Sequence, residues 1–137
     1  MNRLKFTILI SLFPMCLLAH GEDKLGQNGG YIRMPGGFHT EVMISDNKLL
    51  VYLLDINWKD PVTEKSSVFA EYSQKGTSSS LTCSATGNHF SCQLPKHFKA
   101  SDGQFYVQAD RMGMKGAKAE YLLPLKLISP EVDHSKH

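Results

Sequence analysis

Residues 81–92, LTCSATGNHFSC, decide the fold of this chain because they predict a hairpin whose register can be counted. A Gly-Asn pair stands at the centre, and glycine in first place suits a two-residue type II′ turn between antiparallel strands. Counting outward from this turn pairs Thr86 with His89 and places Cys83 opposite Cys92. The cysteine pair falls at a non-hydrogen-bonded position, where the α-carbons come closest. We therefore expect a structural disulfide worth about 2–3 kcal/mol, rather than a metal-binding or redox pair of thiols.

The sequence on both sides of this hairpin alternates strand-like segments with turns. β-Branched and aromatic residues fill the segments, and Gly, Asn, Asp and Pro fill the turns. Residues 49–56, LLVYLLDI, are apolar on both faces and predict a central strand. The pattern predicts an all-β fold, an antiparallel β-sandwich of seven to eight strands. The expected strands are residues 30–34, 38–44, 49–56, 67–73, 79–85, 89–94, 104–110 and 119–127.

The N-terminal residues are typical of a secretory signal peptide. A basic start, MNRLK, precedes the apolar run FTILISLFPMCLLA, which is short for a membrane helix and contains Pro14. Cleavage after Ala19 would leave His20 as the first residue, whereas cleavage after Gly21 fits the small-x-small pattern better and removes His20. We expect an exported, periplasmic protein. Its expected parts are a signal peptide (1–19), a flexible leader (20–29), a β-sandwich domain (30–128) and a loose tail (129–137).

Charge and motifs exclude several classes of function. Loss of Arg3 and Lys5 with the signal peptide reduces the 15 basic residues to 13, equal to the 13 acidic ones. The mature chain has no basic run or aromatic-interleaved patch, which argues against nucleic acid or an anionic membrane as a partner. It also lacks GxSxG, HExxH and phosphate-loop motifs, so we expect no enzymatic activity.

Strict alternation of strand direction would bring every second turn to the same end of the sandwich. The turns at one end would be residues 35–37, 57–61, 87–88 and 112–116. The side chains gathered there would be Met34, His39, Trp58, His89, Met112 and Met114. Thioether and imidazole groups suit copper, Cu(I) especially. The alternative is that the methionines and Trp58 close the end of the core, and that His89 only pairs with Thr86.

Residues 38–44 predict a strand with two different faces. The more apolar face, which should contact the core, carries Phe38, Thr40, Val42 and Ile44. The other face carries His39 and Glu41, which we expect to be accessible. There His39 would bind metal, and Glu41 would either bind the ion or orient the imidazole. His20 would add a terminal amine and a second imidazole if cleavage follows Ala19. A histidine that only makes surface contacts is the alternative.

The segments HGED, NGGYIRMPGGFHTEV, LLVYLLDINWKDP and FYVQADRMG together resemble small exported bacterial β-sandwich proteins of the YtkA-like or FixH-like type. They also resemble the short HG…GG…HxE module of heavy-metal efflux adaptors, whose pattern His20, Gly29, Gly30, His39 and Glu41 match. The chain departs from the module at Phe38, where a second histidine often stands. The resemblance implies an immunoglobulin-like sandwich and the handling of copper or other heavy metals.

Three hypotheses for function follow. The first is a non-catalytic periplasmic protein that binds copper or another heavy metal through His39, Met34, Met112 and Met114, with Glu41 and His20. The second is a periplasmic accessory domain that binds a protein partner and no metal. The third, a copper oxidase using an N-terminal histidine, requires His20 to be the mature terminus.

Overall fold

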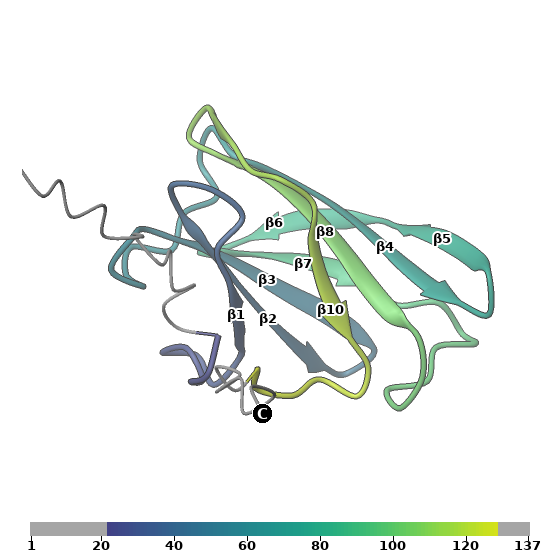
Figure 1. Ribbon diagram of the computed structural model, residues 1–137. Coiled ribbons are helices and arrows are strands. Elements are labelled where there is room, and N and C mark those ends of the chain that lie inside the picture. Colours follow the sequence, from purple (N-terminus) through teal and green to yellow (C-terminus); the bar gives the residue numbers. More distant parts are fainter. Residues whose placement is uncertain (1–21, 129–137) are drawn as a thin grey trace, which may run out of the picture.

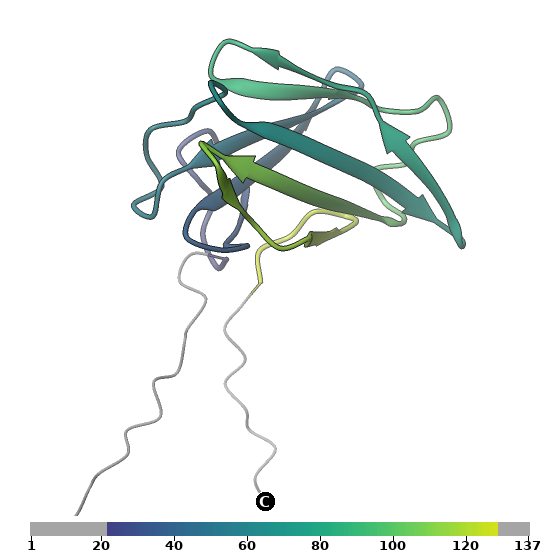
Figure 2. The same cartoon turned by 90° about the horizontal axis from the view of Figure 1, so that it is seen from above.

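The computed structural model describes residues 22–128, and this part of the chain is all-β, with no helix. Its ten strands form two antiparallel sheets (Figures 1 and 2). The first sheet has the spatial order β1 (Tyr31–Arg33), β2 (His39–Ser45), β3 (Lys48–Leu54), β7 (His89–Gln93), β6 (Cys83–Thr86). The second has the order β10 (Ala119–Leu122), β8 (Gln104–Arg111), β4 (Ser67–Gln74), β5 (Thr77–Leu81), with β9 (Met114–Lys115) beside β8. Over the same residues, no helix has the length and apolar character needed to cross a membrane.

The hairpin of β6 and β7 has the register that the sequence predicts. Thr86 pairs with His89, and Cys83 pairs with Cys92. The two cysteines form a disulfide, and their α-carbons are 3.9 Å apart. Gly87 has a φ of +62°, which the first central position of a type II′ turn requires. The expected hairpin and its bridge are therefore confirmed.

Each of the eight expected segments contains a strand; six agree with the observed bounds to within two residues at either end, and two differ more. The expected count of seven to eight strands is too low, since one segment divides in two and β9 forms within the expected turn at 112–116. Residues 79–85 divide into two strands at Thr82, because this segment leaves the second sheet and enters the first. The last expected strand ends at Leu122, shortly before Pro124, which has no N–H to give to a ladder. The prediction of a central strand at 49–56 is confirmed, since β3 lies in the middle of its sheet.

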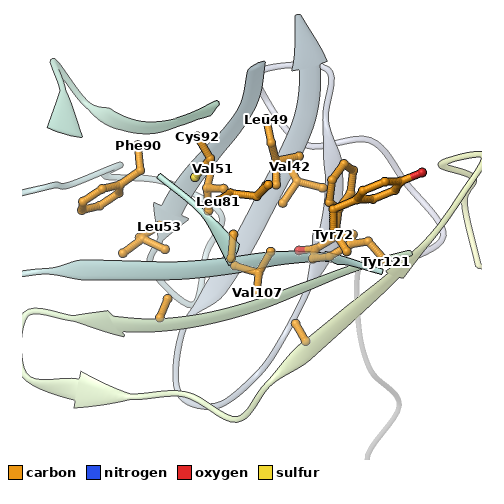
Figure 3. Close-up of a cluster of buried hydrophobic side chains, with 14 of the residues drawn as sticks. Val42, Leu49, Val51, Leu53, Tyr72, Leu81, Phe90, Cys92, Val107 and Tyr121 are labelled. Atoms are coloured by element: carbon orange, nitrogen blue, oxygen red, sulfur yellow. The ribbon is translucent and has the colours of Figure 1, made fainter. Parts of the chain in front are cut away.

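One hydrophobic core fills the space between the two sheets (Figure 3). The first sheet contributes Val42 and Val51, among others, and the second contributes Phe105 and Val107. Strict alternation along the strands produces this core, since residues of one parity point inward on each strand. The arrangement is sandwich-like, with the inner faces of both sheets buried.

A buried polar contact joins the two sheets near one edge. The Thr40 hydroxyl and the Tyr121 phenol oxygen are 2.5 Å apart, and the phenol donates to the Thr40 carbonyl at 3.1 Å. Burial raises the pKa of Tyr121. Arg33 reinforces this edge, since its Nε donates to the Glu120 carbonyl and its guanidinium lies over the Tyr121 ring. Strands β1 and β2 are thereby tied to β10.

Candidate functional site

The four turns that alternation predicts at one end do meet there; we call residues 34–37, 55–61, 87–89 and 111–116 the rim. Hydrogen bonds and one ion pair connect them or their immediate neighbours, so the predicted grouping of turns is confirmed. The hydrogen bonds are Ala117 N–H to the Pro35 carbonyl at 2.9 Å, Arg111 Nη2 to the Asp60 carbonyl at 2.7 Å, and Thr63 Oγ1 to the Gly87 carbonyl at 3.0 Å. The ion pair joins Arg111 and Asp60.

The rim methionines are exposed rather than packed into the end of the core. Met34, Met112 and Met114 are 40%, 56% and 48% exposed. Met114 lies against Gly37, because a β-carbon placed on that glycine would be only 2.7 Å from the Met114 sulfur. Since Gly37 stands two residues before His39, the Met114 thioether lies beside the start of the histidine strand. The three methionine side chains are therefore partly exposed at this end of the molecule.

His39 is 2% exposed, and its two ring nitrogens have different surroundings. Nδ1 lies 3.0 Å from the Asp55 carbonyl oxygen. A carbonyl only accepts hydrogen bonds, so Nδ1 carries a proton and donates it. Within residues 22–128, Nε2 of His39 is the buried side-chain nitrogen or oxygen that lacks a hydrogen-bond partner. A neutral ring with Nδ1 protonated presents an unused lone pair at Nε2.

The expectation that His39 and Glu41 lie on an accessible face is wrong, since both are buried. Alternation assigns them correctly to the outer face of the first sheet, where His39 pairs with Leu54 and Glu41 with Tyr52. A second apolar cluster covers this face. Its buried members are Ile32, Tyr52 and Leu54, with Met43, Leu50 and Trp58 packed against them.

Glu41 is fully buried and accepts hydrogen bonds from Asn28. The backbone N–H of Asn28 lies 3.2 and 3.1 Å from the two carboxylate oxygens, and its side-chain amide lies 3.2 Å from Oε1. A β-carbon on Gly30 would come within 2.7 Å of Glu41 Cγ, so glycine permits this close approach. Residues 22–29, expected to form a flexible leader, thus make defined contacts. Glu41 serves as their anchor, with both oxygens engaged.

Residues 55–60, which we call the Trp58 turn, lie against His39. The Asp55 carboxylate accepts from the N–H groups of Asn57 at 2.8 Å and Lys59 at 2.9 Å. The pKa of Asp55 is lowered, most strongly by the hydrogen bond from the Lys59 N–H and also by that from Asn57 and by the charge of Arg111. Desolvation acts in the opposite direction but is outweighed. The turn holds Trp58 at a φ of +64° and sets its ring edge-on to His39, with centroids 5.8 Å apart.

The other histidines of the prediction lie elsewhere or beyond the described residues. His89 stacks on Tyr52 with ring centroids 4.9 Å apart and faces Thr86 across the hairpin, as its alternative role requires. His20 lies outside the described residues, as do the expected signal peptide and C-terminal tail. From residue 22 to residue 128, no three side chains of His, Cys, Asp or Glu gather in a way that could hold a metal ion.

Sequence reasoning missed two residues that shape this region. Asp55 organises the Trp58 turn, and an aspartate that opens a turn of the form DINWK is a recognisable signal for such a cap. Asn28 anchors the N-terminal segment, and no local pattern points to its partner thirteen residues away. Comparison with known family models, curated proteins and solved structures found no match to this chain. Function is therefore argued from the site alone.

Proposed function

We propose that this protein is an exported, non-catalytic metal-binding protein that holds copper, or another soft heavy-metal ion, through Nε2 of His39. The proposal rests on one observation, which is that the two ring nitrogens of His39 have different surroundings. Nδ1 donates to the Asp55 carbonyl, and Nε2 is buried with no partner. Metal-binding histidines usually donate their second ring N–H to a carbonyl or carboxylate, which fixes the tautomer and directs the free lone pair at the ion.

The energetic cost of this arrangement favours a ligand role. Leaving a buried polar atom unpaired costs about 1–3 kcal/mol, and native proteins retain such atoms rarely. A hydrogen-bond donor beside Nε2 would remove that cost. A metal ion removes it as well, and it gives the histidine a function.

Thioethers on the same rim supply the rest of the ligand set. Met114 is the leading candidate because its sulfur packs against Gly37, close in sequence to His39. Met34 and Met112 are exposed at the same end of the molecule. Imidazole with thioether sulfur is a soft-to-borderline set that suits Cu(I) better than calcium or magnesium. Glu41, engaged with Asn28, supports the site by holding residues 22–30 in place.

The proposal also includes a periplasmic location and an immunoglobulin-like type of sandwich. The strand order supports the immunoglobulin-like type. With β1 and β9 left out, β2-β3-β7-β6 can be lettered A-B-E-D and β5-β4-β8-β10 can be lettered C′-C-F-G, which is an order that immunoglobulin domains have. The Cys83–Cys92 bridge suits an oxidising compartment. The bridge lies within one sheet rather than between the two, so it serves the hairpin and not the pairing of the layers.

Titration of the metal-free protein with Cu(I), in competition with a chromophoric chelator, tests the proposal. We expect one equivalent to bind and His39→Gln to weaken binding by about tenfold or more, since the strand histidine supplies a principal ligand. His89→Gln is the matched control, because His89 is a half-buried histidine of the same sheet that already stacks on Tyr52. Equal affinity in the wild type and His39→Gln would contradict the proposal. Absence of any bound metal would favour the accessory protein-binding alternative.

A further inference from the structure

We infer that the Trp58 turn is a gate over His39, which must move outward before anything in solution reaches Nε2. The idea that this gate controls the entry of metal rests on the proposed function. The existence of the gate itself can be tested without metal. The starting point is that Nε2 is buried, as is the whole His39 side chain. An ion cannot bind an atom that solvent does not touch, so binding through Nε2 requires some wall of the site to move.

The strand that carries His39 and the segment that covers the neighbouring Glu41 are both fixed, one by regular structure and the other by a buried anchor. The strand wall is the β2–β3 ladder, in which His39 pairs with Leu54. The N-terminal segment lies against Glu41, two residues further along the same face, and is held by the hydrogen bonds from Asn28 to the buried Glu41 carboxylate. Opening either would break ladder bonds or leave a buried charge without partners.

The Trp58 turn is the wall best suited to move. Its outward side chains, Ile56, Asn57, Lys59 and Asp60, are exposed. Outward movement would take Trp58 from its packing on the second apolar cluster and break the Arg111–Asp60 contacts, but it would break no strand pairing. Trp58 occupies the left-handed region of backbone conformation, which is unfavourable for a bulky L-residue. The closed turn therefore holds a local strain at Trp58.

Asp55 couples the gate to the histidine. Its backbone carbonyl accepts from His39 Nδ1, and its carboxylate holds the N–H groups of Asn57 and Lys59 on either side of Trp58. One residue thus orients the imidazole and closes the turn that covers it. Weakening the Asp55 carboxylate contacts should open the gate without removing the indole.

Chemical modification of the metal-free protein tests the gate directly. Diethyl pyrocarbonate acylates the unprotonated imidazole nitrogen, and mass spectrometry of peptides follows His39 separately from His97, which is exposed and serves as the internal reference. We expect Trp58→Ala to raise the rate at His39, relative to His97, by about tenfold or more, because a buried nitrogen reacts only through its open state. Trp58→Phe keeps a ring over the histidine and should stay near the wild-type rate.

Two further variants separate a gate from a general loss of structure. Asp55→Ala should raise the rate at His39 while the indole remains, and Ile56→Ala, an exposed position of the same turn, should leave it unchanged. Equal His39 rates in the wild type, Trp58→Ala and Asp55→Ala would overturn the gate whatever the metal titration shows. A His39 that opens as expected in a protein that binds no Cu(I) would overturn the proposed function and leave the gate standing.

Discussion

Replacing Tyr121 with phenylalanine should destabilise the protein measurably, because it removes a buried hydroxyl that is hydrogen-bonded between the sheets. That oxygen lies 2.5 Å from the Thr40 hydroxyl and donates to the Thr40 carbonyl at 3.1 Å. Tyr121 and Thr40 are both fully buried, so no water replaces the lost partner. The variant leaves the Thr40 hydroxyl and carbonyl without this contact.

The expected loss follows from the cost of an unpaired buried group, about 1–3 kcal/mol, and we take about 2 kcal/mol as the central value. For a domain of this size that corresponds to a fall in melting temperature of roughly 8 °C. Thr40→Val removes the hydroxyl but keeps the carbonyl that accepts from Tyr121. The double variant should therefore cost less than the sum of the two single variants, by about 0.5–1.5 kcal/mol, since it leaves no unpaired hydroxyl.

Urea unfolding of the four proteins, followed by circular dichroism with the disulfide intact, gives the free energies needed for this cycle. All four should show the same dependence on urea, because the surface exposed on unfolding is nearly equal. A loss below about 0.5 kcal/mol for Tyr121→Phe, or strict additivity in the double variant, would refute the reasoning.

Three other predictions concern stability. The Cys83→Ala/Cys92→Ala variant should lose about 2–3 kcal/mol in the same urea assay, because the bridge closes a loop between residues nine apart, and a loss well under 1 kcal/mol would argue against it. Asn28→Ala should speed hydrogen exchange in residues 25–30 and cost about 1.5–3 kcal/mol, since it removes a donor to a buried carboxylate; unchanged exchange would count against the anchor. The lowered pKa of Asp55 means that its stabilising contribution is present above the unfolded value, about 3.9, and is lost as the pH falls through the folded value. Asp55→Asn should therefore flatten the acid side of the stability curve, and an equally steep fall in both proteins would contradict this.

The local features of the fold follow from the sequence because turn chemistry and alternation are local. The Gly-Asn turn alone sets the register that pairs Cys83 with Cys92. The apolar character of residues 49–56 is enough to place β3 inside its sheet. Alternation along β2 also identifies the residues that point into the core, such as Val42.

The burial of His39 and Glu41 could not be predicted in the same way. Alternation states which face of a sheet a residue is on, but not what lies over that face. The covers come from other segments of loop-like composition, GQNGG against Glu41 and DINWKD against His39. Their docking depends on single contacts, those of Asn28 with Glu41 and of Asp55 with His39, which leave no periodic trace in the sequence.

In the candidate site, too, one part could be predicted from the sequence and another part could not. The assumption that successive strands alternate in direction correctly predicts that the four turns of the rim lie together. It also places the three methionines at that end of the molecule. Which ring nitrogen of His39 carries the proton could not be predicted in this way, because that depends on a hydrogen bond to one backbone carbonyl. That bond turns a strand histidine of ordinary appearance into a specific candidate ligand.

The most direct test of the account is a long-range ¹H–¹⁵N NMR spectrum of histidine-labelled protein, before and after one equivalent of Ag(I), a redox-stable substitute for Cu(I). Before addition, His39 should show a protonated Nδ1 and an unprotonated Nε2. After addition, the Nε2 resonance of His39 should move to the range of a coordinated nitrogen, while His97 stays unchanged. An Nε2 resonance that does not move when the protein binds Ag(I) would contradict the central claim.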